Sequence, residues 1–402
     1  METLLNPSHA DVRVEFGMAV SEVAQRSAWR AQAELFGAID DTLREAAAHP
    51  ELFVSARLVR GDAVDLAVRS AAADLAVRLS LSENTVRNYG HRAATLRQRL
   101  PELWGWFREG EVSTPNASEA ATVVADLPGE VWATFEQRIL QPARTMAPAR
   151  FRTLVRRLAE RLQSETRETR HRAARERRGV WSELDRDGMG FLNLYLPVED
   201  LGRITANLDA IAVALDAGPD ETRTIAQLQA DTAVDLLTGA GTGANVTATV
   251  AITVPVMTLL GQSSEPAVME GVGPIDLEAA RALTAAAPSL TRLLTDPVSG
   301  EILTMESKQY RPTAAMRRWL ALTQVTCDFP GCGRRARHCD LDHTVAWAEG
   351  GLTTTANLVY RCRKHHRMKH ESKWRVEKPP GTKTATWTSP TGYRREADPP
   401  PF

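Results

Sequence analysis

Apolar residues recur with the period of an α-helix through the first 178 residues. In the stretch VSEVAQRSAWRAQAELFGAIDDTLREAAA (residues 20–48), apolar side chains lie three and four positions apart, and Pro and Gly are sparse. Ala and Arg, which both favour helices, are abundant in the chain. The pattern predicts a mainly α-helical N-terminal domain.

The period changes to that of a β-strand between Gly179 and Pro197. The sequence VWSELDRDGMGFLNLYLP alternates apolar and polar residues around Asp187-Gly188, which predicts a hairpin. Two further helices are expected at residues 198–217 and 224–239, and a strand-like run, TATVAITVPV, follows them. The Gly-rich stretch before that run lacks the Lys of a phosphate-binding loop, so we interpret it as a linker. The N-terminal domain therefore contains a small β-containing segment.

Residues 74–96, DLAVRLSLSENTVRNYGHRAATL, have the form of a helix-turn-helix. One helix is expected to end near Leu79, and Ser82 can cap a second helix that carries Arg87, Asn88 and His91. In a DNA-binding motif of this kind, the second helix presents such polar residues to the major groove. An ordinary helical hairpin with a capping Ser accounts for the same pattern, so both interpretations stay open.

Composition and charge restrict the function classes. No run of about 18 apolar residues exists, so no membrane span is expected, and the first residues lack the pattern of a secretory signal. The four Cys all fall between residues 327 and 362, which favours a metal site in a reducing compartment, the cytoplasm, over a disulfide framework. Residues 301–402 carry 18 Lys and Arg against 10 Asp and Glu, although the net charge of the chain is −1. Such a surplus of basic residues is typical of a domain that binds the phosphates of DNA.

Metal ligands occur in two close pairs near the C-terminus. Cys327 and Cys332 are separated by four residues, and Cys362 and His365 by two. Two such pairs can close a tetrahedral site of three Cys and one His, which stabilises a small fold that lacks a large core. We therefore expect a structural Zn²⁺ at these four residues.

A second set of residues is interleaved with these ligands. Asp342-His343, then Asn357 after the GG of AEGGLTTTANL, and then His366 follow in an order that resembles the HNH endonucleases of the zinc-knuckle ββα-metal type. The resemblance implies that His343 is the general base and that Asp342 and His366 bind one catalytic cation, Mg²⁺ or Mn²⁺ or another divalent ion. It also implies that Asn357 either ties the loop that holds His343 or joins the metal, and the presence of His366 favours the tether.

The helix expected after Cys362 carries further candidates. Arg367 and Lys369 are candidate contacts to DNA phosphates, and His370, four residues beyond His366, is a candidate phosphate contact or extra metal ligand. The predicted function is metal-dependent hydrolysis of phosphodiester bonds in DNA. The alternative is a non-catalytic zinc-knuckle protein of a mobile element that binds nucleic acid.

A second resemblance covers most of the chain upstream of these motifs. The helical region, DGMGFLNLYLP, AQLQADTAVDLL, GPIDLEAARAL and LLTDPVSGEIL together resemble a bacterial domain of unknown function, number 222, found upstream of HNH modules. The resemblance implies a mostly helical domain at residues 1–315 and a zinc-stapled ββα-metal module at residues 316–402. The module is expected to end in a hairpin, since WRVEKPPGTKTATWTSPTGYRR alternates on both sides of PPG.

Overall fold

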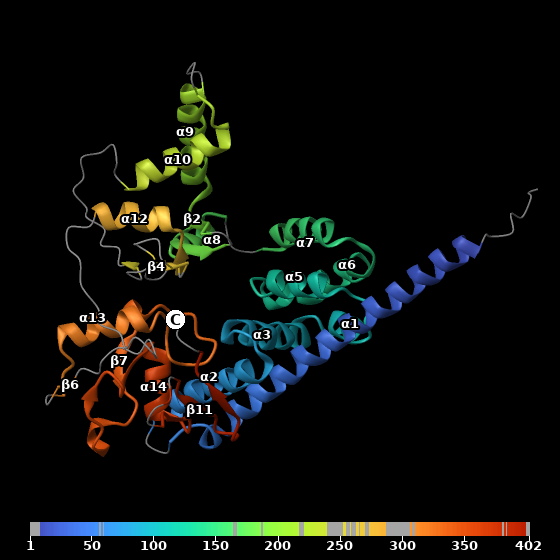
Figure 1. Cartoon of the computed structure of the whole chain (residues 1–402). Helices are drawn as coiled ribbons and strands as arrows, with labels where there is room; N and C mark the ends of the chain where they lie inside the picture. Colours follow the sequence, from blue (N-terminus) through green and yellow to red (C-terminus); the bar gives the residue numbers. More distant parts are fainter. Residues whose placement is uncertain are drawn as a thin grey trace, which may run out of the picture. The chain divides into compact units, whose positions relative to one another are not determined.

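The computed structural model is mainly helical and has several small β-sheets (Figure 1). It divides into two compact units, which we call unit 1 (Met1–Ser164 and Asp296–Phe402) and unit 2 (Glu165–Thr295). Within the described part of the chain, no helix combines the length and apolarity that a membrane span requires. The residues that the structure describes are 9–55, 58, 60–163, 167–185, 188–216, 221–238, 252–254, 258, 263–264, 266–269, 273–286, 306–307, 310–379, 382 and 384–398.

The helices predicted in the first 163 residues are confirmed. All of them except the second share one core of buried aromatic and aliphatic side chains, among them Phe36, Leu96, Phe107, Phe135 and Phe151. They are α1 (His9–Ala48), α2 (Arg60–Leu79), α3 (Glu83–Arg99), α4 (Pro101–Arg108), α5 (Thr114–Val124), α6 (Trp132–Thr145) and α7 (Pro148–Leu162), with short 3-10 turns η1 (Pro50–Leu52) and η2 (Gly129–Val131).

The turn between α2 and α3 matches the predicted boundaries. The first helix ends at Leu79, Ser80 takes a left-handed conformation (φ 54°), and the Ser82 hydroxyl accepts the backbone N–H of Thr85 at 3.0 Å. Gly90 lets α3 approach α1 closely, because a Cβ there would lie 2.9 Å from the side chain of Leu43. The turn therefore places the first residue of α3 at a defined point beside α1 and α2.

Unit 2 contains the predicted hairpin and helices. Strands β1 (Gly179–Leu184) and β2 (Gly190–Tyr195) pair antiparallel, and Gly188 in the turn has φ +71°; Asp187 and the Gly-rich linker lie outside the described residues. The two predicted helices are confirmed as α9 and α10. The elements are α8 (Arg167–Arg175), β1, β2, α9 (Val198–Asp216), α10 (Ile225–Thr238), β3 (Ile252–Thr253), β4 (Ala267–Met269), β5 (Gly273–Ile275) and α12 (Leu277–Ala286).

The C-terminal part of unit 1 is built from short strands and two helices. Strands β7 and β9 pair antiparallel and lead into α14, and the predicted terminal hairpin, β10 with β11, gains a third strand, β12. Trp387 of β11 is fully buried. The elements are β6 (Glu306–Ser307), α13 (Ala314–Thr323), η3 (Ala336–His338), β7 (Asp340–His343), η4 (Trp347–Glu349), β8 (Thr353–Thr354), β9 (Leu358–Arg361), α14 (Arg363–Glu371), β10 (Arg375–Glu377), β11 (Thr386–Thr388) and β12 (Arg394–Glu396).

This C-terminal part packs against α2 (Figure 1). Ala73 and Val77 of α2 share one apolar cluster with Phe329, Met368 and Trp387. The chain after α14 also continues a backbone pairing with the segment after η1, since the N–H of residue 373 donates to the carbonyl of residue 53 at 2.8 Å. The domain boundary expected at residue 315 therefore does not coincide with a boundary between the two compact units. Residues 316–402 belong to the same unit as α2, against which they bury apolar surface.

Candidate metal centres and the groove beside them

The four predicted zinc ligands lie together. One ligand atom each from Cys327, Cys332, Cys362 and His365 falls within 4.8 Å of the others. The first pair sits on a tight turn in which the N–H of Cys332 donates to the carbonyl of Phe329 at 3.0 Å. Cys362 is the N-cap residue of α14, and its N–H donates to the sulfur of Cys327 at 3.3 Å.

The imidazole of His365 is oriented for this site. Its Nδ1 atom lies 3.4 Å from the sulfur of Cys327 and 3.3 Å from that of Cys362, so Nδ1 faces the thiols and Nε2 faces away from them. Three soft sulfurs and one imidazole nitrogen fit Zn²⁺. The fourth cysteine, Cys339, is half-buried, and its thiol lies 3.3 Å from the carbonyl of Arg335.

A second group is formed by Asp342, His366 and His370. The Oδ1 atom of Asp342 lies 3.4 Å from Nε2 of His366 and 3.4 Å from Nε2 of His370, and the three ligand atoms fall within 4.8 Å of one another. Burial opposes ionisation of Asp342, but hydrogen bonds from both imidazoles and two nearby cations outweigh it and hold the pKa of this carboxyl far below its usual range. An ionised carboxylate and two imidazoles that converge in this way can bind one divalent cation.

The second carboxylate oxygen of Asp342, Oδ2, is bound by two cationic side chains. Oδ2 accepts from Nη1 of Arg361 at 2.6 Å and from Nζ of Lys369 at 3.0 Å. Arg361 is fully buried and also donates to Asp328 at 2.7 Å. Lys369, a predicted phosphate contact, is 9% exposed and donates as well to the carbonyl of His343. These contacts fix the carboxylate so that only Oδ1 faces the two imidazoles.

His343 lies on the other side of the same strand. The pairing of β7 with β9 runs without a bulge through Asp342 and His343, so the two side chains point to opposite faces and do not converge. His343 is 7% exposed; its ring stacks on Tyr310, with centroids 5.5 Å apart, and its Nε2 lies 2.9 Å from Oγ1 of Thr353. Burial lowers the pKa of His343 against the opposing charge of Asp342, so its imidazole is neutral at neutral pH.

Asn357 ties the loop between β7 and β9. Its Oδ1 accepts the N–H of Val345 at 2.9 Å, and its Nδ2 donates to the carbonyls of Val345 at 3.1 Å and Leu352 at 2.9 Å. Gly351 is required at this point, because a Cβ there would lie 1.9 Å from the carbonyl oxygen of Val345. Of the two roles expected for Asn357, this geometry matches the tether.

The second group opens on a groove of about 800 Å³. His366 and His370 form part of its wall, so a bound cation would be accessible from it. Arg367, another predicted phosphate contact, lines the groove and pairs with Glu371. Arg363, which no sequence motif indicated, is an exposed cation of the same wall. The lining residues are Asp340, Arg363, His366, Arg367, His370 and Glu371.

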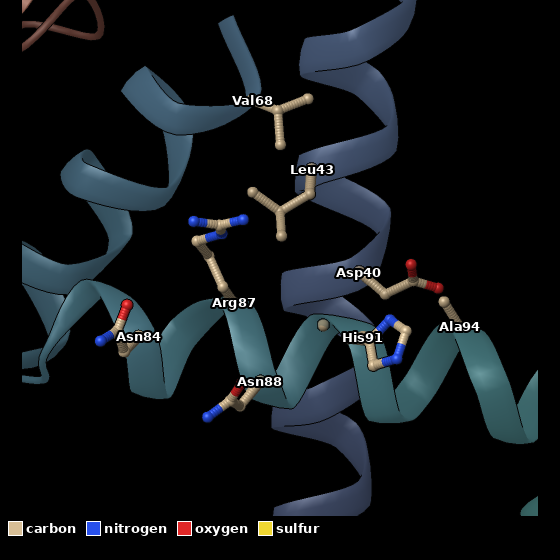
Figure 2. Close-up of a pocket in the computed structure, with 9 residues that line it drawn as sticks. Asp40, Leu43, Val68, Asn84, Arg87, Asn88, His91 and Ala94 are labelled. Carbon is tan, nitrogen blue, oxygen red and sulfur yellow. The ribbon is translucent and has the colours of Figure 1, made fainter. Parts of the chain in front are cut away.

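The polar residues of the helix-turn-helix line a different groove, of about 500 Å³ (Figure 2). Arg87, Asn88 and His91 of α3 are exposed, and they border this groove together with Asp40 and Leu43 of α1. The long helix α1 therefore forms one side of this groove.

The fold and the Cys/His cluster define a mainly helical protein with a candidate metal-binding site near its C-terminus. A family profile described as "Domain of unknown function (DUF222)" matches residues 26–322, and the chain belongs to this family. The predicted resemblance of the upstream region is thereby confirmed.

Similar proteins occur in Mycobacterium tuberculosis. The uncharacterized protein Rv2100 is 42% identical over 86 residues, which are 21% of this chain and 15% of that protein. The uncharacterized protein Rv3776 is 41% identical over 86 residues, 21% of this chain and 16% of its own length. The similarity therefore covers about one sixth of these relatives or less. No solved structure matches the chain.

Proposed function

We propose that this protein is a metal-dependent DNA endonuclease of the HNH type. The observation that carries the proposal is the convergence of Asp342, His366 and His370 at the wall of an open groove. Hydrolysis of a phosphodiester needs an activated water, a Lewis acid at the scissile phosphate and stabilisation of the leaving oxygen. A divalent cation at these three residues would supply the Lewis acid and keep coordination positions open for water and phosphate.

The donor set bears on which cation is bound. One carboxylate with two imidazoles is softer than the all-oxygen sites that Mg²⁺ prefers. Among the expected cations, this favours Mn²⁺ or another first-row transition metal over Mg²⁺. The ionised state of Asp342, stabilised by Arg361 and Lys369, keeps one negative charge at the site across the physiological pH range.

The hydrogen bonds of His343 support its role as the general base. The hydroxyl of Thr353 donates to the carbonyl of Tyr310 at 3.3 Å, which uses its only hydrogen. Oγ1 of Thr353 must then accept from Nε2–H of His343, which leaves the free lone pair of the neutral ring on Nδ1. Nδ1 is the atom that would take the proton from the attacking water.

DNA would be held by cations beside the metal group. Arg363 and Arg367 line the groove, and guanidinium groups suit phosphate oxygens because they can donate two parallel hydrogen bonds. The surplus of basic residues in the C-terminal part would add attraction that weakens with salt. The Cys and His cluster would hold a structural Zn²⁺ that stabilises the loops carrying these residues.

One observation favours the alternative, a nucleic-acid-binding protein without turnover. His343 is buried and faces away from Asp342, so in this arrangement it does not reach a phosphate at the second group. The basic groove and a zinc knuckle would be sufficient for binding alone. Catalysis by His343 would therefore require Tyr310 and Trp347, whose rings contact its imidazole from two separate segments, to move aside.

Incubation of the purified protein with supercoiled plasmid separates the two functions. Mg²⁺, Mn²⁺, Ni²⁺, Zn²⁺ and a chelator are compared, and DNA binding is measured in parallel with the same protein. Nicked or linear plasmid that needs a divalent cation and disappears in Asp342→Ala supports the nuclease. Plasmid that is retarded but intact under every condition would support the alternative, a nucleic-acid-binding protein without turnover.

A further inference from the structure

A residue of the helical region contacts the candidate zinc site. Oε1 of Glu83, the first residue of α3, lies 2.7 Å from Nε2 of His365. The two residues are 282 positions apart in the chain, and their side chains are 13% and 1% exposed. The contact is therefore a tertiary one, made inside unit 1 and largely shielded from water.

The two nitrogens of His365 have different partners. Nδ1 faces the sulfurs of Cys327 and Cys362, so it is the nitrogen that would bind Zn²⁺. A neutral imidazole that coordinates through Nδ1 carries its hydrogen on Nε2. That N–H points at the carboxylate of Glu83, which can only accept. A carboxylate behind a ligating imidazole fixes the tautomer and orientation of the ring and raises its basicity as a ligand.

We infer that Glu83 is a positioning residue of the zinc site, supplied by the helical region to orient His365. The inference rests on the zinc site of the proposed function and extends it to a residue outside the C-terminal part. The left-handed Ser80 and the Ser82 cap set the place of Glu83 at the start of α3. The same carboxylate also pairs with Lys364.

Zinc binding and the packing of α2 and α3 are consequently linked. Ala73 and Val77 of α2 pack in the apolar cluster that includes Cys327 and Cys362, so the metal ligands are supported from two helices of the N-terminal region. Linkage is reciprocal: if docking of these helices raises zinc affinity, bound zinc stabilises the docking by the same free energy. Bound zinc would thus stabilise the contact between two segments of unit 1 that lie more than 200 residues apart in the chain.

The test measures zinc affinity of the full chain by competition with a chromophoric chelator. Glu83→Ala is expected to raise the Kd for Zn²⁺ about 10- to 100-fold, the usual effect of losing such a partner. Glu83→Gln should lose less, because its amide oxygen still accepts from Nε2. Lys364→Ala removes only the ion pair and serves as the matched control, with a Kd near that of wild type.

A second background separates orientation of the imidazole from general packing. In His365→Cys the ligand is a thiolate without an N–H, so adding Glu83→Ala should bring no further loss of zinc affinity. The visible spectrum of the Co²⁺-substituted protein should shift in Glu83→Ala with His365 present. Equal losses in both backgrounds would overturn the inference, because Glu83 would then act only through packing.

The outcomes distinguish this inference from the proposal it rests on. Wild-type protein that holds no zinc would overturn both the zinc site and the role of Glu83. Wild-type protein that binds zinc with a Kd unaffected by Glu83→Ala would overturn the role of Glu83 alone. Plasmid cleavage is not a readout here, so failure of the nuclease activity would leave this result unchanged.

Discussion

Nη1 of Arg361 lies 2.6 Å from Oδ2 of Asp342, and both side chains are buried. The guanidinium also binds Asp328, so one buried cation pairs with two carboxylates. Because of this arrangement, the same contact that orients a candidate metal ligand also holds the β7–β9 pair together.

Replacement of Arg361 by Met should destabilise unit 1 strongly. Loss of Arg361 removes the buried cation that Asp328 and Asp342 share and leaves Asp342 with Lys369 alone, which costs about 3–5 kcal/mol. Urea denaturation of the full chain measures the change. The exposed Arg363→Met on the neighbouring helix is the control and should stay within about 0.5 kcal/mol of wild type. Equal stability of the two variants would contradict the buried network.

His343→Ala should abolish plasmid cleavage while zinc content and DNA affinity stay near wild type. Removal of a general base costs about 10²–10⁴ in rate. His366→Ala and His370→Ala should also lose activity, but part of it should return at higher divalent cation concentration, since each weakens a ligand. If a higher cation concentration also restored the activity of His343→Ala, His343 would be a metal ligand and not the general base.

Thr353→Val should reduce the cleavage rate by less than His343→Ala does. Val keeps the shape of the buried side chain but cannot accept from Nε2 of His343, so the ring loses the contact that leaves its lone pair on Nδ1. Thr353→Ser keeps the hydroxyl and is the matched control. Single-turnover rates for Thr353→Val that equal those of Thr353→Ser would show that the hydroxyl does not set the tautomer.

Asn357→Ala should lower cleavage without weakening the binding of the divalent cation. Its amide joins the backbone of Val345 to that of Leu352, so its loss loosens the loop beside His343. Isothermal titration with Mn²⁺ checks this. A loss of Mn²⁺ affinity as large as that of His366→Ala would make Asn357 a ligand. Gly351→Ala should be more severe in stability, because its Cβ would overlap the carbonyl of Val345.

Glu136→Gln should stabilise the helical region at neutral pH. Burial raises the pKa of the Glu136 carboxyl, although the backbone N–H of Leu103 at the start of α4 donates to it at 3.0 Å. A raised folded-state pKa means that the stability from this group is fully present below its unfolded pKa, about 4.3, and is lost as pH rises through the folded pKa. The Tm of Glu136→Gln should therefore exceed that of wild type at pH 7, with the difference closing toward pH 4. The exposed Glu130→Gln is the control and should leave the Tm near that of wild type.

Local patterns predicted the elements whose causes are local. The Ser82 cap, the hairpin around Gly188 and the close ligand pairs depend on residues within a few positions, so the sequence places them correctly. His370 could also be placed beside His366, because residues four apart share a helix face.

Contacts between segments far apart in the chain could not be predicted from local sequence patterns. Glu83 is one of many glutamates in a helical sequence, and nothing near it indicates that it meets His365. In the sequence, Arg361 is one of the basic residues of the expected DNA-binding part. In the structure it is buried and paired with Asp328 and Asp342. The resemblance implies that His343 and Asp342 serve one catalytic site, but β7 pairs with β9 without a bulge, so strand alternation places the two side chains on opposite faces.

The nine-residue helix α14 carries ligands of both candidate metal groups in consecutive positions, His365 for one and His366 for the other. Successive residues of a helix are rotated by about 100°, so the angle between the two groups is set by a single peptide step. One residue inserted between them would turn the following His366 and His370 away from Asp342 while His365 stayed in place. The rotation of residues along this short helix therefore couples the two groups, so an insertion or deletion between their ligands would disrupt one of them.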